Sequence, residues 1–156
     1  MSKCKLLSLD TSSSCTGYAV YVDCKLKKHG ALDLKRSKEP YKYRRMIKLI
    51  KELLDKEKPD IVVAELPCVH AGIQSHRLLE RILGVVEDCC EDRNIYYHEE
   101  IPSHWRCLVK TSPVPKGRKE VKAWDISLVK ELFGVEVGDD EADAILIGLA
   151  YIKEFA

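Results

Sequence analysis

The chain has 156 residues, of which 46% are hydrophobic and 33% charged, and its formal net charge is +1. This composition is typical of a soluble globular protein and excludes a low-complexity or strongly acidic chain, so we expect one domain over residues 1–156. No apolar stretch approaches the roughly 18 residues that cross a membrane. No signal-like segment opens the chain, and the seven cysteines contain no CxxC pair. We therefore expect a cytoplasmic protein with reduced thiols and no membrane partner.

The first predicted strand, residues 4–10, is apolar and ends in an acid. Leu6, Leu7 and Leu9 lead to Asp10, and a loop of small residues separates this strand from the next apolar run. A carboxylate at the end of a buried strand is costly unless a cation lies beside it. We interpret Asp10 as a candidate metal ligand, with a turn cap as the alternative.

The next part of the chain has the pattern of two further strands, about 17–24 and 28–34, with a polar turn at 25–27. Their connections are too short for parallel crossovers, so these strands and the first should form an antiparallel meander. Over residues 40–56 the apolar side chains recur at spacings of three and four. This spacing predicts an amphipathic helix.

An almost wholly apolar strand, residues 60–65, follows this helix and ends in Glu65. A strand that returns through a helical crossover lies parallel to the earlier strand in the same sheet. This arrangement brings the carboxyl ends of both strands, and with them Asp10 and Glu65, to one edge of the sheet. Taken alone, Glu65 is equally explained as a paired residue at that edge.

Helical periodicity, prolines and turn residues predict the remaining elements. In chain order they are a helix at 73–92, a short strand at 94–98, a brief helix at 102–108, a basic loop at 110–119, and helices at 120–133 and 139–155. Gly134 is expected to end the helix at 120–133. The sequence thus predicts alternating strands and helices, which is typical of an α/β protein.

The last helix contributes two further acids to the candidate site. Asp140 and Asp143 are three residues apart, so they share one face of its first turn. Taken alone, these acids are explained by N-terminal capping and the helix dipole. Together with Asp10 and Glu65, however, they form a set of four carboxylates that would repel one another without bound cations. Two Mg²⁺ or Mn²⁺ ions, which prefer oxygen ligands, would remove that repulsion and support phosphodiester hydrolysis.

In this order and spacing the motifs resemble those of the RuvC family of Holliday junction resolvases, including short phage-encoded members, within the ribonuclease H-like superfamily. LSLDTSSSCTGYAV is similar to the family's first strand, with Asp10 as its acid. VVAELP is similar to the second motif, with Glu65, and DDEADAILIGLA to the terminal DxxDA motif, with Asp140 and Asp143. The resemblance covers about residues 4–153.

Three departures from the family pattern concern the site. Ser12 stands where the family usually has glycine, and Asp139 adjoins Asp140, although the DxxD spacing favours Asp140 as the ligand. The loop at 66–71 lacks the aromatic residue that bacterial members insert into the junction. We therefore expect weak selectivity among branched substrates, while the roles of Cys68 and His70 stay open between surface positions and DNA contacts.

The segment from Ser103 to Trp124 holds six basic residues and one acid, a balance that suits contact with DNA phosphates. The predicted DNA contacts are Arg106, Lys110, Lys116, Arg118, Lys119 and Lys122. The resemblance further implies that Lys116 and Lys119 assist cleavage. A solvated loop without a partner is the alternative. Trp105 fits stacking on DNA and packing equally well, whereas Trp124 is expected in the core.

The resemblance implies a ribonuclease H-like α/β fold with a five-stranded mixed sheet flanked by helices. It also implies a homodimeric endonuclease of DNA recombination and repair, with two Mg²⁺ or Mn²⁺ ions per active site and no organic cofactor. Its expected substrates are four-way junctions and other branched DNA, cut by paired nicks that leave a 5′-phosphate and a 3′-hydroxyl. The helix at 73–92 is the expected dimer contact. The alternatives are a ribonuclease H-like nuclease acting on RNA or RNA–DNA hybrids, and a non-catalytic junction-binding module.

Overall fold

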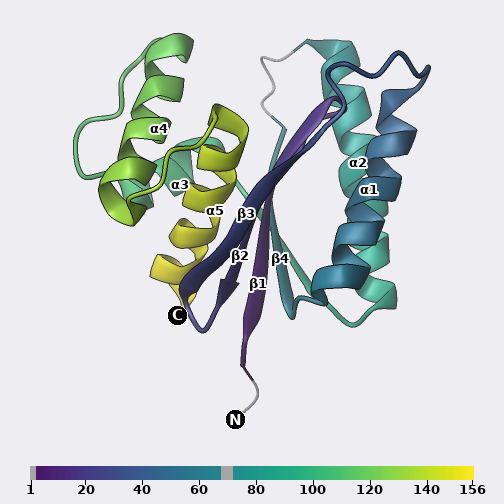
Figure 1. The fold of residues 1–156 in the computed structure, drawn as a ribbon, viewed down its shortest axis with the longest axis horizontal. Coiled ribbons are helices and arrows are strands. Elements are labelled where there is room, and N and C mark those ends of the chain that lie inside the picture. The colour runs from purple at the N-terminus through teal and green to yellow at the C-terminus, as the bar shows by residue number, and fades with distance from the viewer. Residues whose placement is uncertain (1–2, 68–71) are drawn as a thin grey trace.

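The structure is a computed structural model that describes residues 3–67 and 72–156. Its strands are β1 (Lys5–Asp10), β2 (Cys15–Val22), β3 (Lys25–Asp33), β4 (Ile61–Glu65) and β5 (Tyr96–Glu100). Its helices are α1 (Lys42–Glu57), α2 (Ile73–Asp92), α3 (Pro102–Val109), α4 (Arg118–Phe133) and α5 (Asp139–Phe155). Figure 1 shows these elements in one compact arrangement around the sheet. No helix in the described part of the chain is long and apolar enough to cross a membrane.

The five strands form one mixed sheet in the order β3-β2-β1-β4-β5. β1, β2 and β3 are an antiparallel meander, whereas β4 pairs with β1 in parallel and β5 pairs with β4 in parallel. The carboxyl ends of β1 and β4 therefore lie at one edge, which carries Asp10 and Glu65. This topology confirms the predicted α/β fold with its five-stranded mixed sheet.

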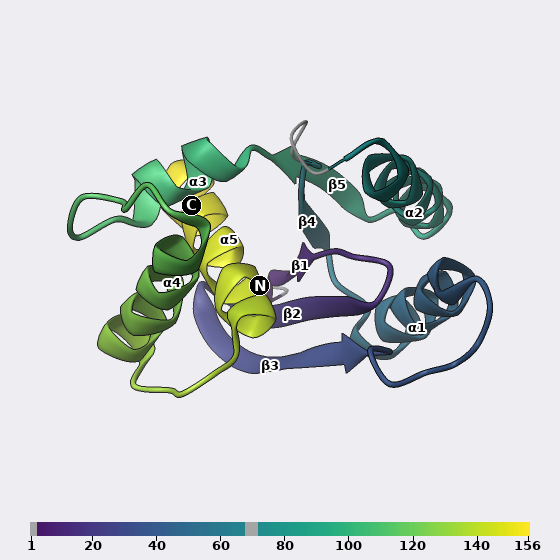
Figure 2. The same cartoon turned by 90° about the horizontal axis from the view of Figure 1, so that it is seen from above.

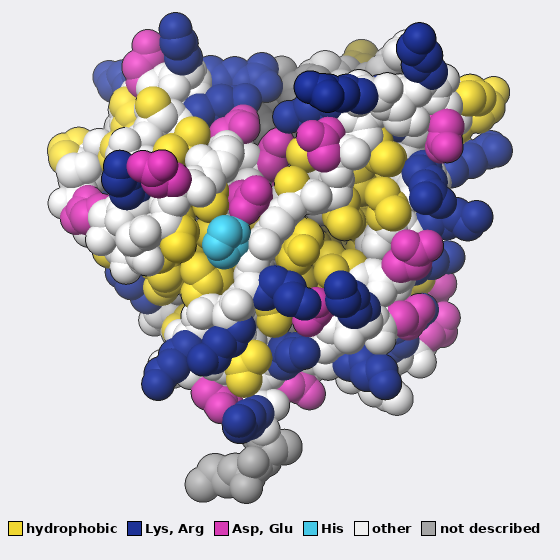
Figure 3. Space-filling view, in the orientation of Figure 1, with side chains coloured by type: hydrophobic (Ala, Val, Ile, Leu, Met, Phe, Trp, Pro, Cys, Tyr) yellow, Lys and Arg dark blue, Asp and Glu magenta, His cyan; other side chains and the backbone are white. Residues whose placement is uncertain are grey.

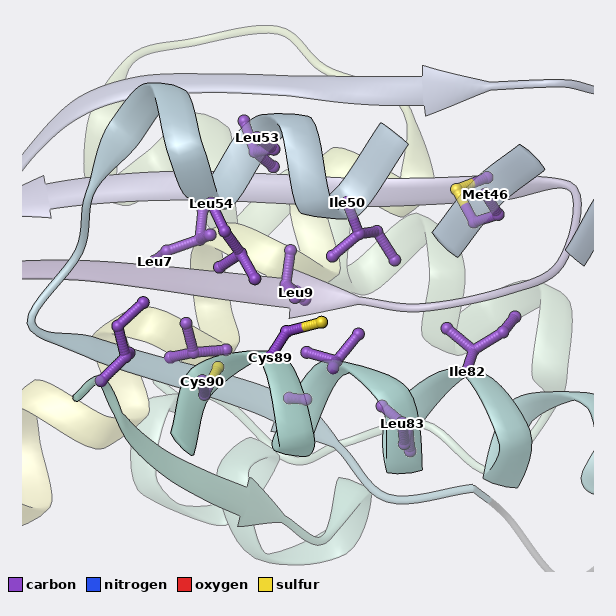
Figure 4. Close-up of a cluster of buried hydrophobic side chains, with 14 of the residues drawn as sticks. Leu7, Leu9, Met46, Ile50, Leu53, Leu54, Ile82, Leu83, Cys89 and Cys90 are labelled. Atoms are coloured by element: carbon purple, nitrogen blue, oxygen red, sulfur yellow. The ribbon is translucent and has the colours of Figure 1, made fainter. Parts of the chain in front are cut away.

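Helices cover both faces of the sheet (Figure 2): α1 and α2 lie on one face, and α3, α4 and α5 on the other. Because side chains alternate along a strand, β1 contributes to both cores. Leu7 and Leu9 pack against α1 and α2, in the cluster shown in Figure 4. Leu6 packs on the opposite face with the apolar residues of α5.

Two hydroxyl groups attach α5 to the sheet through its backbone carbonyls. Ser8 Oγ donates to the carbonyl of Ala144 over 2.6 Å, and Tyr21 Oη donates to that of Ile145 over 2.6 Å. Gly148 permits this close approach, because a Cβ there would lie 2.5 Å from the Tyr21 ring. These contacts fix α5, and with it the acids of its first turn, against β1 and β2.

Several element boundaries differ from the predicted ones; β2 begins at Cys15 rather than at residue 17, and α1 at Lys42 rather than at residue 40. The β2–β3 turn lies at Asp23 and Cys24, which both have positive φ, so β3 begins at Lys25 rather than near residue 28. β5 begins at Tyr96 rather than at Asn94, because Asn94, with a φ of 55°, belongs to the turn after α2. α4 begins at Arg118, inside the segment predicted as a loop.

Candidate metal centre

Acidic side chains gather in one cavity at the sheet edge. Asp10 and Glu65 reach it from the ends of β1 and β4, and Asp140 and Asp143 reach it from the start of α5. The cavity has a volume of about 500 Å³ and is lined by Asp10, Glu65, Pro102, Arg106, Arg118, Val121, Lys122, Asp139, Asp140 and Asp143. Figure 3 shows acidic side chains grouped along the upper edge of the molecule. The structure thus brings the four predicted ligands together, while their binding of metal stays a prediction.

Gly17 explains how α5 comes so close to β2. It pairs with Asp10 in the β1–β2 ladder. A Cβ at this position would overlap the backbone carbonyl of Asp140. Only glycine therefore allows the first turn of α5 to lie directly over β2, and this contact places Asp140 beside Asp10.

Burial and mutual repulsion raise the pKa values of three acids in the cavity. Burial, followed by the charges of Glu65 and Asp140, raises the pKa of Asp10 well above its usual range. Burial also raises the pKa of Glu65. Burial and the charge of Asp10 raise the pKa of Asp143 to about 11. These acids favour protonation unless another cation takes the place of the proton.

Asp143 supplies the observation that best fits a bound cation. Its Oδ1 atom is buried and has no hydrogen-bond partner among the described residues. Buried polar atoms are nearly always satisfied, and an unsatisfied one calls for a missing water or ion. Carboxylate oxygens are the ligands that Mg²⁺ and Mn²⁺ prefer. The donor set therefore fits hard divalent cations.

Trp105 supports the site from within the core. Its side chain is fully buried, and its indole Nε1 donates a hydrogen bond of 2.5 Å to Glu65 Oε2. Of the two roles left open for Trp105, the structure supports packing, because its ring is not exposed to stack on a base. The hydrogen bond orients the Glu65 carboxylate toward the cavity.

Arg106, a predicted DNA contact, lines the cavity, and its guanidinium forms part of the wall of the acidic site. Only 17% of its side chain is exposed, and it forms two hydrogen bonds with Asp125, of 2.8 and 3.2 Å. Its Nη2 atom also lies 3.7 Å from Asp143 Oδ2. Arg106 is thus held as a fixed positive charge next to the acids, while its contact with DNA stays a prediction.

Asp125 is a site-supporting residue that the sequence analysis missed. Its side chain is fully buried on α4, where it accepts both hydrogen bonds from Arg106. One feature of the sequence could have indicated this role: Asp125 lies next to Trp124 and three residues before Leu128, among the apolar side chains of a helix. Such an acid needs a buried cationic partner, which the sequence pattern alone does not identify.

The other predicted DNA contacts divide into two groups. Arg118 and Lys122 line the cavity, and Lys122 Nζ lies 2.8 Å from Asp139 Oδ2, which lowers the pKa of Asp139. Lys110, Lys116 and Lys119 are exposed and do not line it. Arg118 and Lys119 lie in the first turn of α4, so their positions are more fixed than the predicted loop implied.

The remaining residues singled out in the sequence lie away from the acids or outside the described part. Trp124 is half-buried and donates a hydrogen bond to Ser112, so it packs only partly in the core. Cys68 and His70 lie outside the described residues.

A separate group of Glu100, His104 and Glu154 has metal-ligand spacing, but its imidazole and carboxylates already pair with one another.

Comparisons with known proteins show which solved structures share this fold. The sequence matches no family model and no curated protein. The structure is similar to that of Thermus thermophilus RuvC in complex with a Holliday junction substrate, with a TM-score of 0.74 and 16% identity over 96% of this chain and 93% of that one. The fold is that of RuvC-type resolvases.

Two further resolvases have the same fold. Fowlpox virus resolvase, solved with Holliday junction DNA, gives a TM-score of 0.67 at 15% identity and covers 96% of this chain and 97% of its own. The yeast mitochondrial Holliday junction resolvase Ydc2 gives 0.63 at 14% identity and covers 96% and 79%. The resemblance to RuvC drawn from three short motifs is thus confirmed for the fold over almost the whole chain.

Proposed function

We propose that this protein is a metal-dependent endonuclease that resolves Holliday junctions by paired nicks, leaving a 5′-phosphate and a 3′-hydroxyl. The observation that carries the proposal is the set of four partly buried carboxylates in one cavity, with the unsatisfied Oδ1 atom of Asp143, at the edge of a RuvC-type sheet. A non-catalytic junction-binding module would not need this costly cluster of acids.

The chain's own residues suit such a reaction. Asp10, Glu65, Asp140 and Asp143 would hold two Mg²⁺ or Mn²⁺ ions, and the bound pair would activate water and stabilise the departing 3′-oxygen. Trp105 keeps the Glu65 carboxylate oriented. Arg118, which lines the cavity, would bind the phosphate that enters it. Lys116 and Lys119, which are exposed, would bind flanking phosphates and assist cleavage.

Branched DNA is the proposed substrate because structural neighbours of this fold were solved with Holliday junctions. A four-way junction is two-fold symmetric, so cutting both strands requires two active sites and hence a homodimer. The start of α2 supports this assembly, because Ile73 is 75% exposed there. The reaction belongs to DNA recombination and repair in the cytoplasm, which for a phage-encoded chain is that of the host.

Cleavage of end-labelled DNA tests the proposed function. The substrates are a synthetic four-way junction, a linear duplex with the same arm sequences, and an RNA–DNA hybrid, each incubated with Mg²⁺ or with EDTA. We expect paired nicks in the junction only, lost in EDTA and in Asp143→Asn. Cutting of the hybrid alone would instead favour a ribonuclease H-like activity. Binding of the junction without cutting in either Mg²⁺ or Mn²⁺ would favour the binding module.

A further inference from the structure

A strongly basic stretch lies outside the segment to which DNA contacts were assigned. Between residues 35 and 51 the chain has eight basic residues and only one acid, Glu39. The eight are Lys35, Arg36, Lys38, Lys42, Arg44, Arg45, Lys48 and Lys51, and we refer to them as the α1 basic surface. They occupy the loop after β3 and the first two and a half turns of α1.

The charges of this surface are largely unneutralised. Arg44, Arg45 and Lys48 are exposed, and none of them lies within 4.0 Å of a carboxylate in residues 3–67 or 72–156. The three side chains line a surface hollow of about 530 Å³ together with Glu39, Pro40 and Tyr41. Unpaired cations around a shallow hollow are suited to binding an external anion.

Aromatic rings hold part of this surface in place without cancelling its charge. The guanidinium of Arg44 lies 4.7 Å from the centre of the Tyr41 ring, and its Nε donates to Tyr43 Oη over 3.2 Å. From α2, the guanidinium of Arg81 lies 6.0 Å from the centre of the Tyr43 ring. Cation–π stacking restricts the rotamers of both arginines and leaves their outer N–H groups free to donate.

The basic charge lies at the same sheet edge as the metal centre. α1 and α2 begin after β3 and β4, whose carboxyl ends lie at that edge, so the positive ends of both helix dipoles also lie there. The second halves of the two helices, residues 50–57 and 83–92, carry seven acids against the two lysines Lys51 and Lys56; the acids are Glu52, Asp55, Glu57, Glu87, Asp88, Glu91 and Asp92. The charge along both helices therefore favours an anion near their starts, at the edge that holds the acidic cavity.

The α1 basic surface is continuous with that cavity. Lys35 Nζ lies 3.4 Å from Asp140 Oδ2, and Lys42 Nζ donates to the carbonyl of Lys35 over 3.3 Å. Arg118 and Lys122 lie on the cavity wall formed by α4. Figure 3 accordingly shows Lys and Arg on both sides of the acidic side chains along the upper edge. A polyanion that crosses the cavity would meet cations on either side.

We propose that the α1 basic surface binds the phosphate backbone of the duplex arm that leads away from the scissile phosphate. This inference rests on the proposed function and assigns α1 to one part of the substrate. From Lys42 to Lys51 the helix rises about 14 Å at 1.5 Å per residue. That length matches roughly four nucleotide steps at 3.4 Å per strand. Because the contacts are to phosphates, the arm is bound without regard to its base sequence.

The salt dependence of DNA binding tests this assignment. Binding of a fluorescently labelled four-way junction and of a linear duplex is measured in EDTA from 50 to 200 mM salt. The double variant Arg45→Gln/Lys48→Gln is compared with wild type and with Lys25→Gln/Lys27→Gln. This control removes the same charge from exposed residues at the β2–β3 hairpin, at the opposite sheet edge. Circular dichroism verifies that all three proteins are folded.

The expected result follows from counterion release. Each lost phosphate contact makes the slope of log affinity against log salt less steep by about 0.9. The α1 variant loses two contacts, so its slope should be less steep by about 1.8 on both DNAs. Between 50 and 200 mM salt, the affinity of wild type should therefore decrease by a factor about ten times larger than that of the variant. The control variant should keep the wild-type slope.

Three outcomes separate this proposal from the proposed function. If wild type cuts junctions but the α1 variant keeps the wild-type slope, or the control loses as much, the proposed function stands and the α1 assignment is wrong. If the slope falls as expected but no junction is cut, α1 binds DNA and the proposed function fails. If wild type binds neither DNA, the assignment of α1 to DNA is overturned.

Discussion

At the scale of single residues, the site is defined by Asp143 and the charges around it. Its Oδ1 atom has no hydrogen-bond partner in the described chain, and its Oδ2 atom faces Arg106 at 3.7 Å. Arg106 is in turn held by the buried Asp125. One fixed cation therefore offsets part of the repulsion among the acids, and the remainder requires protons or metal ions.

Breaking the buried pair should destabilise the protein and disturb the site. Asp125→Asn leaves Arg106 without its charged partner, and we expect a loss of about 3 kcal/mol in the free energy of unfolding, the lower end of the range for a broken buried pair because Arg106 is partly exposed. It should also weaken Mn²⁺ binding, because Arg106 can then pair more closely with Asp143. Urea unfolding and calorimetric titration with Mn²⁺ measure the two effects.

Asp55→Asn is the matched control, because it breaks the exposed pair with Arg93 far from the cavity. It should change neither unfolding nor Mn²⁺ binding appreciably. Equal stability of Asp125→Asn and Asp55→Asn would show that the buried pair does not support the fold.

The raised pKa of Asp143 predicts how the metal-free protein responds to pH. With a pKa of about 11 when folded and near 3.9 when unfolded, the carboxyl binds more protons in the folded state between these values. Its contribution to stability is therefore full below about pH 4 and decreases as pH rises toward 11. In EDTA, the Tm of wild type should fall more steeply from pH 6 to pH 9 than that of Asp143→Asn.

Adding Mg²⁺ should reduce that difference, because a bound cation takes the place of the proton. Thermal melts of both proteins across this pH range, with and without Mg²⁺, provide the measurement. Parallel curves for wild type and Asp143→Asn in EDTA would contradict the assigned protonation of Asp143.

At the scale of elements, the site depends on how closely α5 approaches β2. Gly17→Ala would place a methyl group against the Asp140 carbonyl and displace the first turn of α5. Because displacements of about 1 Å cost large factors in rate, we expect junction cleavage to fall by about a hundredfold. Mn²⁺ affinity should fall as well.

Gly84→Ala is the control for this substitution. Gly84 lies within α2, and a Cβ there would meet nothing within 4 Å. This change should raise stability by up to about 1 kcal/mol through helix propensity and leave cleavage unchanged. Wild-type Mn²⁺ binding by Gly17→Ala would show that α5 does not need this close contact.

Most elements could be predicted because their patterns are local. The apolar runs of β1 and β4 and the periodicity of α2 determine these elements directly, and the α2 and α5 boundaries are confirmed at 73–92 and 139–155. β5 was misplaced because it is an edge strand of mixed polarity, YYHEE, without an apolar alternation. The turn before β3 was missed because Asp23 and Cys24 adopt positive φ without a glycine.

Part of the candidate site could also be predicted from local patterns, and part could not. The four acids could be predicted because each lies at the end of an apolar segment, and the topology brings those ends together. The residues that support these acids could not be predicted, because their contacts join distant parts of the chain. Arg106 and Asp125 are 19 positions apart, and Trp105 and Glu65 are 40 positions apart. Such pairs depend on how α3 and α4 pack against the sheet, which no local pattern specifies.

At the scale of the whole molecule, the formal net charge of +1 conceals a strong separation of charge. Acids fill the cavity, whereas the starts of α1 and α4 carry cations on either side of it. Bound metal ions would neutralise the acids and leave a positive edge. Total charge is therefore a poor guide to DNA binding in a protein with an acidic metal site.

The proposed homodimer gives a prediction at this scale. Ile73→Asp places a charge at the exposed start of α2 and should shift the protein toward monomer in analytical ultracentrifugation. Ile101→Asp, at a 52% exposed isoleucine before α3, is the control and should leave the sedimentation coefficient unchanged. A wild-type protein that sediments as a monomer at all concentrations tested would contradict the dimer.

Paired, metal-dependent cutting is tested most directly with a supercoiled plasmid that extrudes a cruciform. Two nicks made across the junction in one binding event produce linear plasmid, whereas a single nick relaxes the plasmid and removes the cruciform. With Mg²⁺ we expect linear product from wild type, and none from Asp143→Asn or in EDTA. Nicked circles alone, or linear product that persists in Asp143→Asn, would contradict paired, metal-dependent cutting.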